Sequence, residues 1–123
     1  MGGHLESHPL LDRNQLNKLE SLGGHGLIEK IIDVFLESTP KRIHALLVEK
    51  EKRLFADIGF AAHSLKSSAG NLGARELQFL CEALELACEQ GEMINSGILV
   101  PQVLASYDKT CDALRAERER IRK

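Results

Sequence analysis

The sequence contains no tryptophan and few other aromatic residues, with four phenylalanines and one tyrosine among 123 residues. Its apolar residues are mainly leucine, isoleucine and alanine, which is more typical of helices than of strands. No segment shows the alternation of a half-buried strand. Because 43% of the residues are hydrophobic, the chain can still bury the core of one domain. The composition therefore favours a single all-α domain.

Several other features are also missing. No apolar run reaches the roughly 18 residues that span a bilayer, and no segment resembles a signal peptide. The net charge of −2 gives no reason to expect a nucleic-acid or anionic-membrane partner. The three cysteines form no C-x-x-C pair, and their odd number argues against a disulfide framework. We therefore expect a cytoplasmic protein in a reducing compartment.

Caps, glycines and prolines divide the chain into five expected helices. A capping box of Asp12 and Gln15 begins the first helix, which ends near Leu22 before Gly23-Gly24. Pro40 interrupts the second helix. A single kinked helix is favoured there because the apolar face resumes in register, and the alternative is a new helix capped by Ser38-Thr39. The expected ranges are 12–22, 26–53, 55–72, 74–90 and from about 98–101 to the end.

The last three helices carry apolar residues at helical spacing. The seams are Ile58, Ala62, Leu65, Ala69 and Leu72, then Leu77, Cys81, Leu84 and Cys88, then Val100, Val103, Tyr107, Cys111 and Leu114. After Leu114 the sequence is mostly charged, so its last turns are expected to be solvated. The predicted fold is all-α, an antiparallel four-helix bundle with an additional short N-terminal helix packed as a lid. Residues 1–10 are expected to form a flexible leader, part of it of artificial origin, and residues 11–123 the domain.

One histidine stands out in this pattern. At about 100° per residue, His63 lies nearly opposite the buried seam of its helix, and Gly59, Ser67 and Gly70 share its side. Each glycine inside a helix costs roughly 1 kcal/mol relative to alanine, which the close approach of another surface would explain. Phe60 also projects away from the core. These positions predict a docking face around an exposed imidazole.

A neutral imidazole is a good nucleophile, and its attack on a phosphoryl group gives a phosphoimidazole. Lys66, one turn further along, can neutralise a phosphoryl oxygen. Ser67 and Ser68 can donate hydrogen bonds to it. A solvated surface histidine without a function remains the alternative that spacing alone leaves open.

The stretch His63-Ser-Leu-Lys66-x-Ser68-x-x-x-Leu72-Gly73-Ala74 closely resembles the signature of histidine-containing phosphotransfer (HPt) domains of bacterial phosphorelays. Segments 35–42 and 80–85 are also similar to HPt sequences, so the resemblance covers most of residues 12–115. It implies an HPt four-helix bundle in which His63 exchanges a phosphoryl group with the aspartate of a response-regulator receiver domain. Lys66 would assist the phosphoryl group, and Phe60 and the small residues would contact the partner.

The resemblance also implies how the chemistry is divided between the two proteins. The receiver domain would bring both the aspartate and its Mg²⁺, and this chain would have no cofactor or metal of its own. It would act as a monomeric phosphocarrier without autokinase activity, either alone or as the cytoplasmic module of a membrane-bound hybrid sensor kinase. The sequence departs from the family at Ser67, where glycine is usual. Because serine is small, we expect function to be retained.

Three other functions compete with this interpretation. A kinase dimerisation domain carries an acidic residue after its histidine, where this chain has Ser64, and no Gly-rich nucleotide-binding segment is present. A non-catalytic helical module that docks receiver or kinase domains would not need both His63 and Lys66. A metal site is disfavoured because no H-E-x-x-H occurs. His4 and His8 are four apart, but Pro9 and the flexible leader disfavour a helical pair, His25 follows two glycines in a turn, and His44 has no ligand partner at helical spacing. Cys81 and Cys88 are interpreted as core residues.

Overall fold

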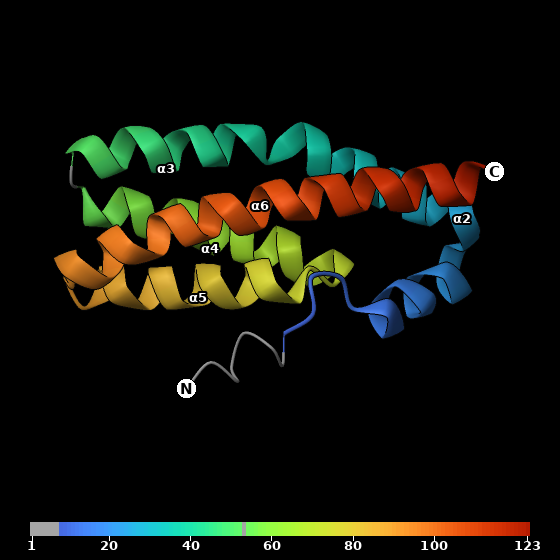
Figure 1. Ribbon diagram of the computed structural model, residues 1–123, viewed down its shortest axis with the longest axis horizontal. Coiled ribbons are helices and arrows are strands. Elements are labelled where there is room, and N and C mark those ends of the chain that lie inside the picture. The colour runs from blue at the N-terminus through green and yellow to red at the C-terminus, as the bar shows by residue number, and fades with distance from the viewer. Residues whose placement is uncertain (1–7, 53) are drawn as a thin grey trace.

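The computed structural model describes residues 8–52 and 54–123, with the side chains of residues 49–52 excepted. Every regular element among these residues is helical. The elements are α2 (Arg13–Ser38), α3 (Pro40–Lys52), α4 (Phe55–Leu72), α5 (Arg75–Glu89) and α6 (Met93–Arg122) (Figure 1).

Four long helical rods run side by side and alternate in direction. The first rod is the second half of α2 continued by α3, and α4, α5 and α6 are the other three (Figure 1). Consecutive rods pack against each other, and α6 closes the bundle against α2 and α3. The antiparallel four-helix bundle with an additional N-terminal helix is thereby confirmed, and the first half of α2 is that helix.

The first half of α2 is separated from the second at Gly24. Its φ of 72° and ψ of −168° are not helical, and glycine adopts them without strain. Asp12 caps the start, since its Oδ1 accepts hydrogen bonds from the backbone N–H groups of Asn14 (3.0 Å) and Gln15 (3.3 Å). The rest of the predicted capping box is absent, because the Gln15 side chain donates to the carbonyl of Asn71 instead.

Polar contacts attach this first half of α2 to the bundle. The N–H of Asp12 donates to the carbonyl of Gly73 at 2.7 Å, and the Arg75 guanidinium lies 3.1 Å from the Asp12 carboxylate. Gly73 ends α4 with a φ of 84°, and a Cβ there would lie 2.9 Å from the Cβ of Gln15. Glycine therefore serves both the left-handed cap and the close approach of α2.

The predicted leader, residues 1–10, lies mostly outside the described residues. Of its last three residues, His8 stacks its ring on Phe79, with centroids 4.3 Å apart. The carbonyl of Pro9 accepts a hydrogen bond from the backbone N–H of Glu76.

The junction at Pro40 has the character of a kink. Thr39 lies between α2 and α3 but keeps helical dihedrals, with φ −82° and ψ −24°. Its hydroxyl donates backward to the carbonyl of Phe35 at 2.6 Å, whereas an N-cap side chain would accept from the following turn. Because Pro40 lacks an N–H, it interrupts the backbone hydrogen bonds of the helix, but the chain does not turn away there.

The start of α6 was predicted about five to eight residues too late. The helix begins at Met93, and Pro101 lies inside it rather than at its first turn. Ser96 supports this earlier start, because its N–H and its hydroxyl both donate to the carbonyl of Glu92. Pro101 deprives only the carbonyl of Gly97 of a partner, and Gly97 is exposed, so water can satisfy that oxygen.

The expectation that the turns after Leu114 are solvated was wrong in part. Glu117 and Ile121 are 6% and 9% exposed. Both carboxylate oxygens of Glu117 accept hydrogen bonds from Arg13 at 2.8 Å, and Arg120 pairs with the same carboxylate. Arg118 pairs with Asp33 of α2 at 2.7 Å. These ion pairs join α6 to α2, while other charged residues of the same turns, such as Glu119, remain exposed.

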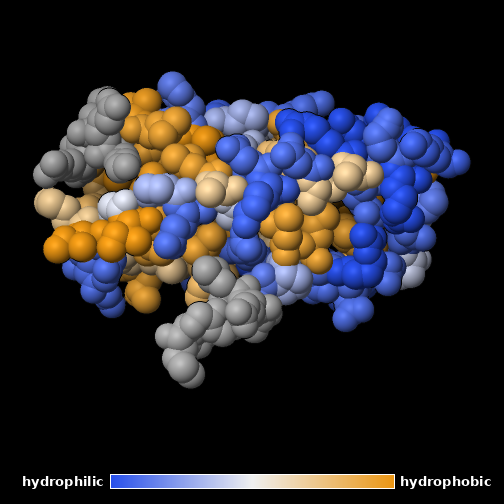
Figure 2. Space-filling model, viewed as in Figure 1, coloured by the Kyte–Doolittle hydropathy of each residue, from blue (hydrophilic) through white to orange (hydrophobic). Residues whose placement is uncertain are grey.

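The predicted seams form the core. Every residue of the three seams is buried, and the three cysteines lie among them as free thiols. Burial raises the pKa of the Cys81 thiol to about 12. In the view of Figure 2, hydrophobic residues show on the surface mainly at the end where α6 begins, and hydrophilic residues cover the opposite end. Met93, Ile94 and Ile98 are exposed at the hydrophobic end.

Candidate functional site

His63 lies on the solvent side of α4, and its side chain is 57% exposed. The seam on the opposite side of the helix, with Ala62 and Leu65 fully buried, fixes this orientation. The imidazole Nδ1 lies 2.7 Å from Oε2 of Glu85 on the neighbouring helix α5. No hydrogen bond to the imidazole Nε2 occurs within the described part of the chain. The ring is therefore held at one nitrogen and open at the other.

Glu85 also binds Lys66. Its Oε1 lies 2.7 Å from the Lys66 ammonium, so the two carboxylate oxygens are divided between histidine and lysine. The hydrogen bond from Lys66, helped by the one to His63, lowers the pKa of the Glu85 carboxyl, and the same bond to Glu85 raises the pKa of Lys66. Because an ionised carboxylate can only accept, a neutral His63 carries its hydrogen on Nδ1 and its lone pair on Nε2.

Glu85 is the functional residue that sequence reasoning missed. It lies 22 positions from His63, and only the packing of α5 against α4 brings the two together. Segment 80–85 is similar to HPt sequences, but that similarity alone implied no role for the Glu85 carboxylate. The sequence did contain one signal for it. Glu85 directly follows the buried Leu84 of the apolar seam, so its side chain is expected at the edge of that seam.

A shallow hollow of about 290 Å³ adjoins the imidazole. It is formed by the first two turns of α4 and the end of α5, and its lining includes Gly59, Phe60, His63 and Glu85. Phe60 is 66% exposed, as predicted from its place on the helix. A Cβ on Gly59 would lie 3.4 Å from the Cβ of Cys88, so Gly59 is also the place where α5 approaches α4. The predicted docking residues Gly59 and Phe60 thus share one surface with His63.

The other predicted site residues lie further from the hollow. Ser67 is exposed one turn beyond His63 on the same side. Ser68 is rotated about 140° from His63 on the helix, and it lines a different hollow, of about 700 Å³, against α2. Gly70 lines that second hollow too, and a Cβ there would lie 3.0 Å from the Gln78 side chain. The structure does not bring Ser68 or Gly70 into the hollow beside the imidazole.

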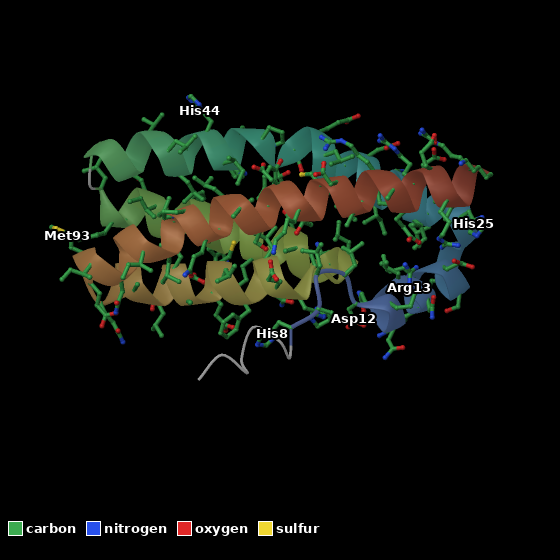
Figure 3. The ribbon with its side chains drawn as sticks, viewed as in Figure 1. His8, Asp12, Arg13, His25, His44 and Met93 are labelled. Atoms are coloured by element: carbon green, nitrogen blue, oxygen red, sulfur yellow. The ribbon has the colours of Figure 1, made fainter. Side chains whose placement is uncertain are left out.

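The remaining described histidines are far apart. His8 lies beside α5, His25 at the turn within α2, and His44 on the outer side of α3 (Figure 3). Among the described residues, no group of three or more His, Cys, Asp or Glu side chains is placed to hold a metal ion. Within the same part of the chain, no helix is long and apolar enough to cross a membrane.

The sequence model of the Hpt domain family matches residues 30–122. Among solved structures, the chain is similar to histidine-containing phosphotransfer protein B of Pseudomonas aeruginosa PAO1. The identity is 24% and the TM-score 0.84, over 91% of this chain and 96% of that one.

A second similar structure is the maize histidine-containing phosphotransfer protein ZmHP2, with 19% identity and a TM-score of 0.78, covering 95% of this chain and 87% of that one. These structural likenesses support the fold, and a search of curated protein sequences gives no match. The family match extends from the middle of α2 to the end of α6 and includes the His63 motif. The chain therefore belongs to the Hpt domain family and acts in histidine phosphotransfer within two-component phosphorelays.

Proposed function

We propose that His63 is the phosphoacceptor of this Hpt domain and exchanges its phosphoryl group with the aspartate of a response-regulator receiver domain. The observation that carries the proposal is the contact between His63 Nδ1 and Glu85 Oε2 at 2.7 Å. It directs the lone pair of Nε2 away from the bundle on a ring that is more than half exposed. A partner can therefore reach the nucleophilic nitrogen without any rearrangement of the core.

The proposed step is a direct exchange. The Nε2 lone pair attacks the phosphorus of the receiver's aspartyl phosphate, an N–P bond forms, and the P–O bond to the aspartate breaks. The aspartate leaves as a carboxylate. The phosphorylated ring keeps its hydrogen on Nδ1 and is cationic, and the ionised Glu85 stabilises that charge. The reverse reaction returns the phosphoryl group to an aspartate.

Lys66 is proposed to stabilise the transferring phosphoryl group. Its side chain is 26% exposed and its ammonium is bound to Glu85, so the ammonium must share or leave that carboxylate to reach a phosphoryl oxygen. Ser67 lies on the same side of α4 and is the nearer of the two proposed serine donors. The receiver domain is proposed to bring Mg²⁺ together with its aspartate, because phosphoryl transfer needs more charge neutralisation than one lysine supplies.

The protein is further proposed to be a stoichiometric carrier without autokinase activity, since the sequence contains no Gly-rich nucleotide-binding segment. It would be a cytoplasmic monomer or the cytoplasmic module of a hybrid sensor kinase. Receiver domains and kinases are the partners that the family implies, and neither nucleic acid nor a membrane surface is expected to bind directly.

The test is to phosphorylate candidate receiver domains with acetyl phosphate and Mg²⁺, mix them with this protein and follow the labelled phosphoryl group. Wild-type protein should become labelled and His63→Gln should not. His44→Gln is the matched control, because His44 is an exposed histidine on α3. Labelling of His63→Gln would contradict the proposal. Incubation with ATP alone should label none of the three proteins.

A further inference from the structure

The solvent side of α5 presents three carboxylates beside His63. Glu82, Glu85 and Glu89 follow one another at spacings of three and four, which places them on one face of the helix. Glu85 is bound to His63 and Lys66. Glu82 and Glu89 are exposed, and neither forms an ion pair or hydrogen bond with the described residues. Both lie near enough to raise the pKa of Lys66 through their charge.

Two hollows flank the pair formed by His63 and Glu85. The first is the hollow of about 290 Å³ that contains Phe60, and the second, of about 480 Å³, lies on α5 and contains Leu86. Among the side chains that the structure describes, Lys66 is the only lysine or arginine that lines either hollow, against the three glutamates of α5. With a neutral imidazole, the described residues that line the two hollows therefore carry two net negative charges, three from the glutamates less one from Lys66.

This acidic surface also has exposed apolar side chains. Phe60 and Leu86 are 66% and 51% exposed, and they lie in the two hollows on either side of His63. Exposed large apolar residues surrounded by polar ones are typical of protein–protein contacts. The two features define a contact surface with apolar positions on both flanks and exposed carboxylates along α5.

We propose that Glu82 and Glu89 select the partner, and that the receiver domains this protein serves carry an excess of lysine and arginine on the surface surrounding their phosphorylated aspartate. This inference rests on the proposed function. Exposed carboxylates without partners steer a basic surface toward the site and repel an acidic one. Phosphorylation of His63 adds further negative charge at the centre of the surface, so the preference for a basic receiver should be strongest when this protein is the donor.

The experiment uses a panel of purified receiver domains whose surface around the aspartate ranges from acidic to basic. The rate of phosphoryl transfer from this protein to each receiver is measured at low and high ionic strength. The doubly substituted Glu82→Lys/Glu89→Lys is compared with Glu37→Lys/Glu119→Lys, which reverses two exposed carboxylates outside the site. Glu119 lies near the end of α6. With a helical rise of about 1.5 Å per residue, it is roughly 25 Å from His63 along the bundle.

For the wild type we expect the rate to increase with the basic charge of the receiver and to fall as salt is added. Reversal at Glu82 and Glu89 should slow transfer to the most basic receivers by about tenfold or more at low salt and remove the preference. The control should behave as wild type. Thermal unfolding of each variant shows whether the fold is intact.

An unchanged preference in folded Glu82→Lys/Glu89→Lys, or a rate that does not depend on receiver charge, would overturn this inference while leaving His63 as phosphoacceptor. Absence of transfer between wild-type protein and every receiver would instead overturn the proposed function. The two failures are therefore distinguishable in one set of measurements.

Discussion

The imidazole Nδ1 of His63 lies 2.7 Å from the carboxylate Oε2 of Glu85, a residue on the next helix of the bundle. This contact orients a side chain that is otherwise surrounded by solvent. An exposed histidine normally samples several rotamers and both tautomers. The contact with Glu85 selects one tautomer, and it is the one that leaves the outward nitrogen unprotonated.

Replacing Glu85 tests this orientation. Glu85→Ala removes the acceptor, so transfer through His63 should fall by roughly tenfold to a hundredfold, as expected for a lost hydrogen bond to a charged group. Glu85→Gln keeps an oxygen that can accept from Nδ1 but loses the charge, so its rate should lie between those of the alanine variant and wild type.

The ¹⁵N chemical shifts of His63, recorded at pH 9, separate orientation from general damage. Wild type and Glu85→Gln should show the hydrogen mainly on Nδ1, and Glu85→Ala a mixture with the hydrogen on Nε2. If Glu85→Ala keeps both the tautomer and the rate of wild type, Glu85 does not position His63.

Phe60 gives a second prediction. Because its side chain is 66% exposed, Phe60→Ala should change the free energy of unfolding by no more than about 0.5 kcal/mol. If Phe60 contacts the receiver domain, the same substitution should weaken binding, measured by titration calorimetry with an unphosphorylated receiver. Leu22→Ala is a suitable control, since Leu22 is 72% exposed on α2. Unchanged receiver affinity in Phe60→Ala would remove this side chain from the contact.

Ser67 gives a third prediction. It is exposed one turn from His63, at a position where the family usually has glycine. Ser67→Gly should therefore keep phosphoryl transfer, whereas Ser67→Tyr should block the approach of the receiver and slow transfer strongly. Both variants should unfold within a few degrees of wild type, with Ser67→Gly the less stable because glycine inside a helix is destabilising. Full transfer by the tyrosine variant would mean that Ser67 lies outside the docking face.

Glu117 predicts a pH dependence of stability. Hydrogen bonds from Arg13 and Arg120 lower the pKa of this carboxyl from 4.5 to about 2. Because the pKa of Glu117 is lower in the folded than in the unfolded state, its ionised carboxylate stabilises the fold. This stabilisation is complete above pH 5 and is lost as the pH falls from 4.5 toward 2. Its size is about 1–3 kcal/mol, because the arginine partners are half exposed and screened.

The measurement is thermal unfolding of wild type and Glu117→Gln between pH 6 and pH 2.5. The glutamine variant should be less stable at pH 6, and the difference should shrink as the solution is acidified. Glu119→Gln, at an exposed position of the same helix, should track wild type across the range. A difference that stays constant with pH would show that the carboxylate charge does not stabilise the fold.

The sequence was sufficient for the helices whose apolar residues repeat at helical spacing. All five seam residues of α4, from Ile58 to Leu72, are buried, and the break at Gly24 lies next to the predicted stop. These features are local: the spacing of residues within one helix determines the buried seam, and a single glycine determines the break. The exposed position of His63 was predicted for the same reason.

The features that were missed depend on contacts between distant residues. The charged residues after Leu114 predicted a solvent-exposed end of the helix. The pairing of Glu117 with Arg13, however, joins residues 104 positions apart and buries the carboxylate. The position of Glu85 beside His63 depends on the packing of α5 against α4, which no spacing within either helix contains. The start of α6 was expected at about 98–101, and the sequence alone does not show that the carbonyl that Pro101 leaves unpaired faces water, which lets the helix begin before the proline.

The burial of the three cysteines has a practical consequence for solution work. Cys81, Cys88 and Cys111 are at most 7% exposed, and burial raises the pKa of each thiol, so little thiolate is available to an alkylating reagent. A single cysteine added at a surface position such as Glu119 should then react with a maleimide dye ahead of the native thiols. Fluorescent reporters can thus be attached at chosen positions on an otherwise unaltered chain.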